Sequence, residues 1–289
     1  MLISILKTMR PKQWTKNVFV FAGLVFDGQL LQVGPFIQTL IGFILLCFAS
    51  GTVYIINDIA DIEQDKQHPK KRQRPLASGR LSIRVAGIAT TVLGVATLAL
   101  SFFLNRWFGA LVLTYILINL LYSFRLKHVP IIDVFIVASG FVLRVGAGVM
   151  LITVERFSPW LYVCTTLLAL FLGFGKRRAE LSLLADKANT HRKVLDGYTI
   201  SFLDQLIIIV SATTIMAYSL YTFTAENLLG NQLMMLTIPF VVYGIFRYLY
   251  LIHVEDAGGA PDEVLLTDIP FFTTIIGWGL LVMLILYIG

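Results

Sequence analysis

The chain has 289 residues, of which 57% are hydrophobic and 14% are charged, and its mean hydropathy is +0.80. These values lie outside the range of soluble globular domains and predict an all-α polytopic membrane protein whose constant partner is the bilayer. The net charge is +6. In membrane proteins, an excess of basic residues usually marks the loops on the cytoplasmic side. We therefore attribute the positive charge to topology and predict no nucleic-acid partner. The basic start of the chain lacks the small-residue cleavage site of a secretory signal, so we expect its apolar segments to be retained.

Nine apolar runs follow in order, and a helical span needs about 20 mostly apolar residues. They cover 18–31, 34–56, 82–104, 107–124, 130–152, 158–175, 201–223, 232–254 and 269–288. The sequence therefore predicts about nine transmembrane helices in a single domain, 1–289. The first run is short and ends at Asp27-Gly28-Gln29, so we expect it to tilt or to enter the membrane only in part. Cys47 and Cys164 lie inside apolar runs and are expected to be small buried side chains without a disulfide.

Basic residues are distributed unevenly between alternate loops. With the N-terminus inside, eighteen Lys and Arg residues fall in the inner segments, and only Arg106 and Arg156 fall in outer loops. The inner segments are 1–17, 57–81, 125–129, 176–200 and 255–268. Cytoplasmic loops are enriched in Lys and Arg. We therefore expect a protein of the cytoplasmic (inner) membrane with its N-terminus and its active site facing the cytoplasm.

An acidic and basic island, NDIADIEQDKQHPKKRQRPLASGR, separates the second and third runs. Asp58, Asp61 and Asp65 are spaced by three and four residues, so on a helix they lie within an arc of roughly 60°. Three carboxylates on one face repel one another unless a cation lies among them. With Asn57 they offer only oxygen ligands, which favour Mg²⁺ or Mn²⁺, and Mg²⁺ is usually bound together with substrate phosphates. The alternative is a solvated helix end with ordinary surface charges.

Other charged residues allow two interpretations each. Arg144 lies about 20 Å along the fifth run, too deep to reach either surface easily, and is either an anion receptor in a cavity or part of a structural pair. The cluster in GKRRAEL is either a phosphate site or a topology signal at the headgroups. The same choice holds for Lys16 and Asn17. The four His residues are scattered, and no CxxC or HExxH occurs, so zinc has no ligand set.

The absence of a P-loop, a GxGxxG fingerprint and nucleophilic dyads leaves metal-assisted displacement of a diphosphate, with a lipid as one substrate. The motif NDIADIEQD followed by RPLASGRLS resembles the NDxxDxxxD motif and RPLxSG tail of the UbiA-type intramembrane prenyltransferase superfamily. RPKQWTKN, LYSFRLKHVPIIDV, LRVGAG and GKRRAEL extend this similarity over the whole chain and resemble its decaprenyl-phosphate phosphoribosyltransferase branch. The resemblance implies nine helices around a lipid-accessible central cavity, which we expect to open to the cytoplasm.

The same resemblance implies a chemistry. It is Mg²⁺-dependent transfer of 5-phosphoribose from phosphoribosyl diphosphate to a polyprenyl (decaprenyl-type) phosphate, giving polyprenyl-phosphoryl-5-phosphoribose and diphosphate for cell envelope biogenesis. Lys176-Arg177-Arg178-Ala179-Glu180 replaces the second acidic motif of the aromatic prenyltransferases, which favours a sugar phosphate over a prenyl diphosphate. The alternatives are an aromatic-acceptor polyprenyltransferase of the same superfamily, and a transporter of phosphorylated or lipid cargo, which the sparse outer loops disfavour.

The residues expected to carry this chemistry fall into two groups. The catalytic metal ligands are Asp58, Asp61 and Asp65, with Asn57 as a fourth ligand, for Mg²⁺ or Mn²⁺. The further substrate-binding candidates are Lys16, Asn17, Arg74, Lys127, Arg144, Lys176, Arg177, Arg178 and Glu180.

Overall fold

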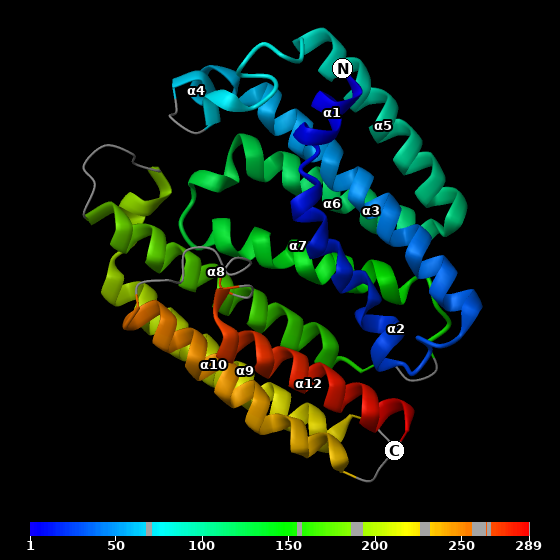
Figure 1. Ribbon diagram of the computed structural model, residues 1–289, viewed down its shortest axis with the longest axis vertical. Coiled ribbons are helices and arrows are strands. Elements are labelled where there is room, and N and C mark those ends of the chain that lie inside the picture. Colours follow the sequence, from blue (N-terminus) through cyan, green and yellow to red (C-terminus); the bar gives the residue numbers. More distant parts are fainter. Residues whose placement is uncertain are drawn as a thin grey trace. The chain divides into compact units, whose positions relative to one another are not determined.

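The computed structural model describes residues 1–67, 71–154, 158–185, 193–225, 232–255, 264 and 267–288. The regular structure of these residues is entirely helical, which confirms the predicted all-α class (Figure 1). Parts of the predicted inner segments 176–200 and 255–268, and Arg156 in a predicted outer loop, lie outside the described residues.

The α-helices are α1 (Leu2–Thr8), α2 (Ala22–Phe26), α3 (Val33–Ala60), α4 (Ile62–Gln67), α5 (Ile83–Leu104), α6 (Arg106–Phe124), α7 (Ile132–Val149), α8 (Trp160–Ala185), α9 (Ile200–Thr224), α10 (Ile238–His253) and α12 (Ile269–Tyr287). Short 3₁₀ helices connect them: η1 (Pro11–Phe21), η2 (Lys71–Gln73), η3 (Leu126–His128), η4 (Lys193–Gly197) and η5 (Leu233–Thr237).

Seven segments of the described chain are long and apolar enough to cross a membrane. They are Val33–Ala60, Ile83–Leu104, Arg106–Phe124, Ile132–Val149, Ile200–Thr224, Leu233–His253 and Ile269–Tyr287. This count does not confirm the nine spans expected from the apolar runs. The first run, 18–31, is divided between η1 and the five-residue α2, and the chain then turns at Gly28, whose φ is 70°. The sixth run forms the N-terminal part of α8, and the C-terminal part of this helix carries the basic GKRRAEL sequence.

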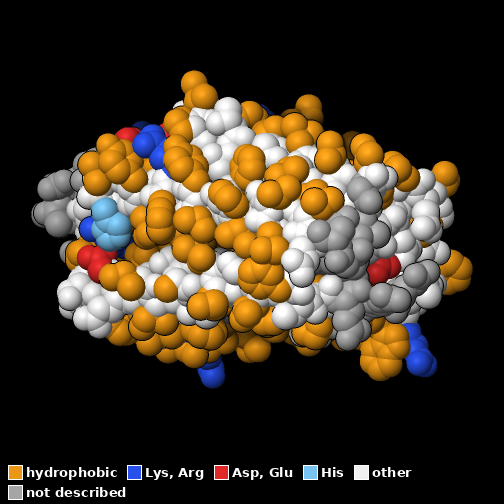
Figure 2. Space-filling view, turned by 90° about the horizontal axis from the view of Figure 1, so that it is seen from below, with side chains coloured by type: hydrophobic (Ala, Val, Ile, Leu, Met, Phe, Trp, Pro, Cys, Tyr) orange, Lys and Arg blue, Asp and Glu red, His pale blue; other side chains and the backbone are white. Residues whose placement is uncertain are grey.

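Large apolar side chains cover much of the surface. Phe103 is 92% exposed, and Ile88 and Ile208 are exposed by 67% and 63%. Figure 2 shows hydrophobic side chains spread over the face in view, with few charged ones among them. Exposure of so much apolar surface is unfavourable in water, whereas the lipid tails of a bilayer match it. With the seven apolar helices, this surface identifies a multi-pass membrane protein.

The chain divides into two compact units, which are described separately. Unit 1 comprises Met1–Val25, Gln29–Arg125 and Leu143–Val154, and unit 2 comprises Phe26–Gly28, Leu126–Val142 and Glu155–Gly289. Helix α7 contributes its first part to unit 2 and its last part to unit 1. The predicted single domain therefore stays a prediction.

In unit 1, α3 packs against α5, α6 and η1 (Figure 1). The core between them includes Val20, Leu46, Phe108 and Val112. The end of α7 approaches η1 so closely that a Cβ on Gly148 would lie 1.8 Å from the carbonyl oxygen of Val20. Only glycine fits there, and this close approach fixes η1, which carries two of the predicted site residues, against α7.

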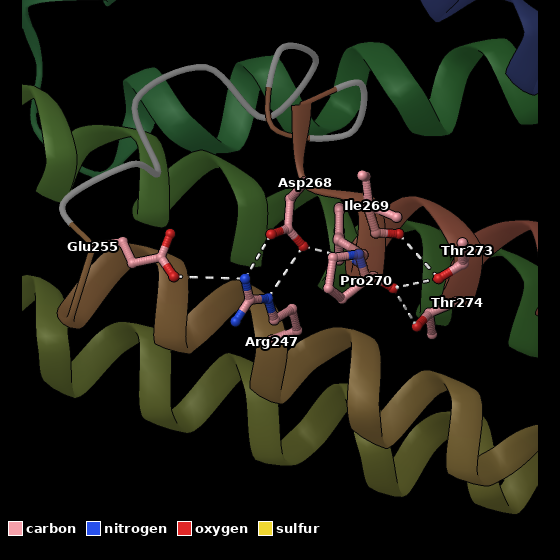
Figure 3. A network of polar contacts seen from close by, with 8 residues as sticks. Arg247, Glu255, Asp268, Ile269, Pro270, Thr273 and Thr274 are labelled. Carbon is pink, nitrogen blue, oxygen red and sulfur yellow. Dashed lines mark hydrogen bonds and ion pairs between the residues drawn. The ribbon is translucent and has the colours of Figure 1, made fainter.

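In unit 2, α8 packs along α9, and α10 packs along α12. Phe171, Phe174, Leu203 and Tyr248 form part of the core. The loop before α12 is tied to α10 by a fork between Arg247 and Asp268 (Figure 3).

In this fork, Nη2 of Arg247 lies 2.6 Å from Oδ2 of Asp268 and Nε lies 3.1 Å from Oδ1, while Glu255 lies 3.5 Å away on the other side (Figure 3). Asp268 also caps α12, because its Oδ1 accepts a hydrogen bond of 2.8 Å from the backbone N–H of Phe271. The guanidinium hydrogen bonds lower the pKa of Asp268 below its usual value.

Candidate active site

The acidic motif lies where α3 ends. Asn57 and Asp58 occupy the last turn of α3, Asp61 follows the helix with φ −97° and ψ 8°, and Asp65 lies on α4. The single helix expected through the motif is therefore interrupted at Asp61. Asp58 and Asp65 are both 2% exposed, whereas Asp61 is half-buried. Two of the three predicted carboxylates are thus removed from water, where an unpaired charge is costly.

Arg74 bridges these two carboxylates. Its Nη1 lies 2.6 Å from Oδ2 of Asp65 and 3.2 Å from Oδ1 of Asp58. Because both oxygens contact the same nitrogen, they are at most about 5.8 Å apart. The cation that the carboxylate spacing required is therefore a guanidinium in this arrangement.

The RPLASG sequence is a compact loop that holds Arg74 in place. Ser78 N–H donates to the Arg74 carbonyl at 2.9 Å, and Leu81 N–H donates to the Pro75 carbonyl at 3.0 Å. Gly79 adopts φ 76°, a left-handed conformation that favours glycine. Leu76 and Leu81 are buried in a cluster with Ile55 and Ile62 of the acidic segment. These contacts explain why an arginine at the start of this motif faces the carboxylates.

Arg10 is a second cation at Asp58, and the sequence did not single it out. Its Nη2 donates to Oδ1 of Asp58, and its guanidinium lies 4.7 Å from the centre of the Tyr54 ring, one turn earlier on α3. The Arg10 backbone is left-handed, with φ 54° and ψ 66°. This conformation costs about 1–2 kcal/mol for a residue with a Cβ, so the contacts with α3 must offset it. The Met9 side chain, packed against Gly51, anchors the preceding residue.

The donor set suits a hard divalent cation. Asn57 Oδ1 is buried and has no hydrogen-bond partner among the described residues, so it is an oxygen available to a ligand. Among the described residues, no three His, Cys, Asp or Glu side chains are grouped for metal binding. Asp61 therefore does not join Asp58 and Asp65 in a three-carboxylate site. Mg²⁺ is commonly bound by one or two carboxylates, with substrate phosphates completing its coordination. Asp58, Asp65 and Asn57 fit that pattern.

Arg144 forms a second polar network in unit 1, joined to another predicted residue. It is 6% exposed, and its Nε donates to Oδ1 of Asn17 at 2.7 Å. Its Nη2 donates to the Tyr115 hydroxyl at 2.9 Å. Asn17 in turn donates to Ser50 Oγ and Cys47 Sγ, each at 3.3 Å. The structure therefore brings Asn17 and Arg144 together, and it adds Tyr115, which the sequence did not indicate.

Both networks of unit 1 contact the same face of α3. Cys47, Ser50, Tyr54 and Asp58 are spaced by three, four and four residues, so they form one stripe along the helix. Asn17 contacts its first two members, and Arg10 contacts its last two. Eleven residues of helix span about 16 Å. A continuous polar stripe thus connects the acidic motif with the buried Arg144.

The GKRRAEL segment lies on α8 in unit 2, and Arg177 there is paired on both sides. Its Nε lies 2.7 Å from Oδ2 of Asp133, and its Nη1 lies 2.6 Å from Oε2 of Glu180. The other oxygen of Asp133 accepts a hydrogen bond of 2.7 Å from the Tyr198 hydroxyl. Burial and the bond to Asp133 raise the pKa of Tyr198 well above its usual value. The same hydroxyl accepts at 2.5 Å from the N–H of Ile131, whose φ is 68°.

The remaining predicted cations are distributed over both units. Arg178 binds Oδ1 of Asp204 at 2.7 Å through Nε and the Ile252 carbonyl at 2.9 Å through Nη1. Lys176 is half-buried on α8, and Lys127 is half-buried in η3 of unit 2. Lys16 is half-buried in η1 of unit 1. Their roles as phosphate ligands stay predictions.

The fold and the site define a class of protein. It is an all-helical membrane protein in which guanidinium groups hold two buried carboxylates at the end of one span. The sequence profile of the UbiA prenyltransferase family matches residues 17–266. The chain belongs to this family and is a membrane-embedded transferase.

Relatives with assigned names extend this similarity over nearly the whole chain. The decaprenyl-phosphate phosphoribosyltransferase of Corynebacterium glutamicum is 33% identical over an alignment that covers 98% of this chain and 86% of that protein. The enzyme of the same name from Mycobacterium tuberculosis H37Rv is 30% identical, with 91% and 88% covered.

Among solved structures, a UbiA homologue from Archaeoglobus fulgidus bound to GPP and Mg²⁺ has a TM-score of 0.71 and 20% identity. The comparison covers 97% of this chain and 99% of that one. A UbiA homologue from Aeropyrum pernix K1 has a TM-score of 0.63 at 15% identity. At these identities the likeness demonstrates a shared fold.

Proposed function

We propose that this chain transfers 5-phosphoribose from phosphoribosyl diphosphate to a polyprenyl phosphate of the decaprenyl type, with Mg²⁺ as cofactor. The observation that carries the proposal is the 33% identity to a decaprenyl-phosphate phosphoribosyltransferase over 98% of the chain. The convergence of Asp58 and Asp65 supports it, because two buried carboxylates close to one point suit a metal that carries a diphosphate.

The reaction is a displacement at the anomeric carbon of the ribose. An oxygen of the polyprenyl phosphate forms the new bond to C1, the bond from C1 to the diphosphate oxygen breaks, and diphosphate leaves with the electron pair. The attacking phosphate is already anionic, so no strong general base is needed. The protein must instead position two anions against their mutual repulsion.

We assign Asp58, Asp65 and Asn57 to the metal. A role for Asp61 as a further ligand stays a prediction. A bound Mg²⁺ would neutralise charge on the diphosphate and make it a better leaving group. We assign Arg74 to the diphosphate because it lies at these carboxylates.

The other two phosphates are the 5-phosphate of the ribose and the phosphate of the lipid. The candidates to bind them are Lys16, Lys127, Lys176 and Arg178. We assign Arg177 a positioning role, because it is 4% exposed and holds Asp133 and Glu180 at once. Arg144 and Asn17 are assigned to an anion that reaches the buried end of the α3 stripe.

We further propose that nine membrane segments place the N-terminus and the site on the cytoplasmic side of the inner membrane. The excess of basic residues in alternate loops supports this orientation. Single cysteines introduced at Lys66 and at Arg106, in a background without Cys47 and Cys164, test it. In sealed inverted vesicles, a membrane-impermeant maleimide should label position 66 and leave position 106 unlabelled; the reverse pattern would overturn the orientation.

The direct test uses purified protein in detergent or nanodiscs with Mg²⁺, radiolabelled phosphoribosyl diphosphate and a polyprenyl phosphate. Label should appear in the lipid fraction and disappear when the metal is chelated. Omission of the acceptor lipid controls for hydrolysis of the donor. An aromatic prenyltransferase would instead prenylate 4-hydroxybenzoate from a polyprenyl diphosphate, and a transporter would move labelled cargo into vesicles unchanged. No labelled lipid under any metal condition would refute the proposed activity.

A further inference from the structure

Arg10 and Arg74 occupy the position at which a divalent cation would bind the acidic motif. Both guanidinium groups contact the same oxygen, Oδ1 of Asp58, and Arg74 also contacts Oδ2 of Asp65. A carboxylate oxygen that binds two guanidinium groups cannot at the same time offer its lone pairs to a metal ion at about 2.1 Å. A metal ion that binds Oδ1 of Asp58 or Oδ2 of Asp65 therefore has to displace an arginine from that oxygen.

Both arginines can move. The Arg74 side chain is 27% exposed and the Arg10 side chain is 31% exposed, whereas the carboxylates they contact are almost fully buried. Arg74 binds both carboxylates through one nitrogen only, Nη1, instead of forming a two-nitrogen fork. Arg10 keeps a left-handed backbone that its side-chain contacts must offset, so release of its side chain lets the chain at residue 10 relax.

We propose that Arg10 and Arg74 compete with the divalent cation for Asp58 and Asp65, and transfer to the diphosphate when the metal and the diphosphate bind together. The exchange conserves charge pairing, since carboxylates pass from arginine to metal while the arginines pass to phosphate oxygens, which guanidinium groups bind well. Metal alone then binds weakly because it competes with both cations for these carboxylates. Metal with diphosphate binds tightly because the displaced cations gain a new partner.

This inference deepens the proposed function and depends on it only for the nature of the anion. It gives Arg10 a role as a diphosphate-binding residue, and it makes the affinities for metal and diphosphate mutually dependent. The site would thereby favour the metal–diphosphate complex over free metal.

The test measures Mn²⁺ binding by electron paramagnetic resonance of the full-length protein in nanodiscs, with and without inorganic pyrophosphate. Arg10→Gln and Arg74→Gln each remove one competing cation. Without pyrophosphate, each should tighten Mn²⁺ binding by at least about fivefold, the effect of one unit charge at about 4 Å even in bulk water. The factor by which pyrophosphate improves Mn²⁺ binding should fall by a similar amount.

The matched control is Arg72→Gln, which removes an exposed positive charge two residues before Arg74. It reports the general electrostatic field of the loop and should change the Mn²⁺ affinity by less than about twofold. Arg10→Gly is a second variant for Arg10, because glycine adopts φ 54° without strain and so preserves the fold if the Gln variant does not. It should behave like Arg10→Gln.

The proposal is overturned if the variants at positions 10 and 74 match Arg72→Gln, or if they weaken Mn²⁺ binding while remaining monodisperse. The first result would mean a diffuse field effect, and the second would mean that the arginines only hold the carboxylates in shape. Because Mn²⁺ and inorganic pyrophosphate are the probes, a chain that fails to transfer phosphoribose would still give an interpretable result.

Discussion

The Asp133–Arg177 pair in unit 2 allows a quantitative prediction. Asp133 is fully buried, and its two oxygens accept from Arg177 and from Tyr198. Asp133→Asn keeps the shape but replaces one acceptor with an N–H group, and it leaves the Arg177 guanidinium buried with Glu180 as its remaining carboxylate partner among the contacts described above. Breaking a buried ion pair from one side costs about 3–5 kcal/mol. Because Glu180 remains, we expect the lower end, about 3 kcal/mol.

The assay is reversible unfolding in mixed detergent and SDS micelles, followed by circular dichroism. The matched control is Glu63→Gln, which breaks the exposed Lys66–Glu63 pair and should cost no more than about 1 kcal/mol. The double variant Asp133→Asn with Arg177→Met removes the stranded charge and should regain much of the loss, since the cost of breaking a buried pair comes largely from the charge left uncompensated.

Two results would refute this reasoning. Asp133→Asn could cost no more than the Glu63 control, which would show that the pair is not a buried structural contact. Alternatively, Arg177→Met could raise the KM for phosphoribosyl diphosphate while the free energy of unfolding stays constant. That outcome would return Arg177 to the role of phosphate ligand that the sequence suggested.

Three further predictions follow from other parts of the structure. Asp58→Ala and Asp65→Ala should each abolish lipid labelling while the protein still elutes as a folded species, and near-normal turnover in both would refute the metal assignment. The depressed pKa of Asp268 adds stability that is present above its unfolded value of about 3.9 and is lost as the pH falls through its lower folded pKa; Asp268→Asn should flatten the acid side of a plot of melting temperature against pH. Gly148→Ala should strongly lower the melting temperature because its Cβ would overlap the Val20 carbonyl, whereas Gly87→Ala, in an open position of α5, should raise it slightly.

The sequence was most informative where the evidence is local. Apolar runs predicted the helical class, and carboxylate spacing together with RPLASG identified Asp58, Asp65 and Arg74, which the structure brings together. The spacing argument also required a cation among the carboxylates. It could not indicate that two arginines would meet that requirement, because Arg10 is 48 residues away from Asp58 in the chain.

Side-chain contacts that depend on tertiary packing could not be predicted for the same reason. Tyr115 is 29 residues from Arg144, and Asp133 is 44 residues from Arg177, so no periodicity connects either pair. The first apolar run was long enough to suggest a span, yet it forms a 3₁₀ segment followed by a short helix. Some of its apolar side chains are buried, such as Val20, and others are exposed, such as Val18 at 54%. Composition does not distinguish the two kinds, so hydropathy alone could not predict this conformation.

An arginine that contacts two carboxylates occurs in both units, and the burial of Arg74 and of Arg177 decides what each of these two can do. Arg74 joins Asp58 and Asp65 in unit 1, and Arg177 joins Asp133 and Glu180 in unit 2. The Arg177 side chain is 5% exposed and uses two nitrogens, so leaving its carboxylates would strand charge away from water. The Arg74 side chain is 27% exposed and uses one nitrogen, so it can exchange partners through solvent at low cost. An arginine that must release its carboxylates to a metal has to be of the second kind, and this difference supports cation exchange at Arg74 and a fixed supporting role for Arg177.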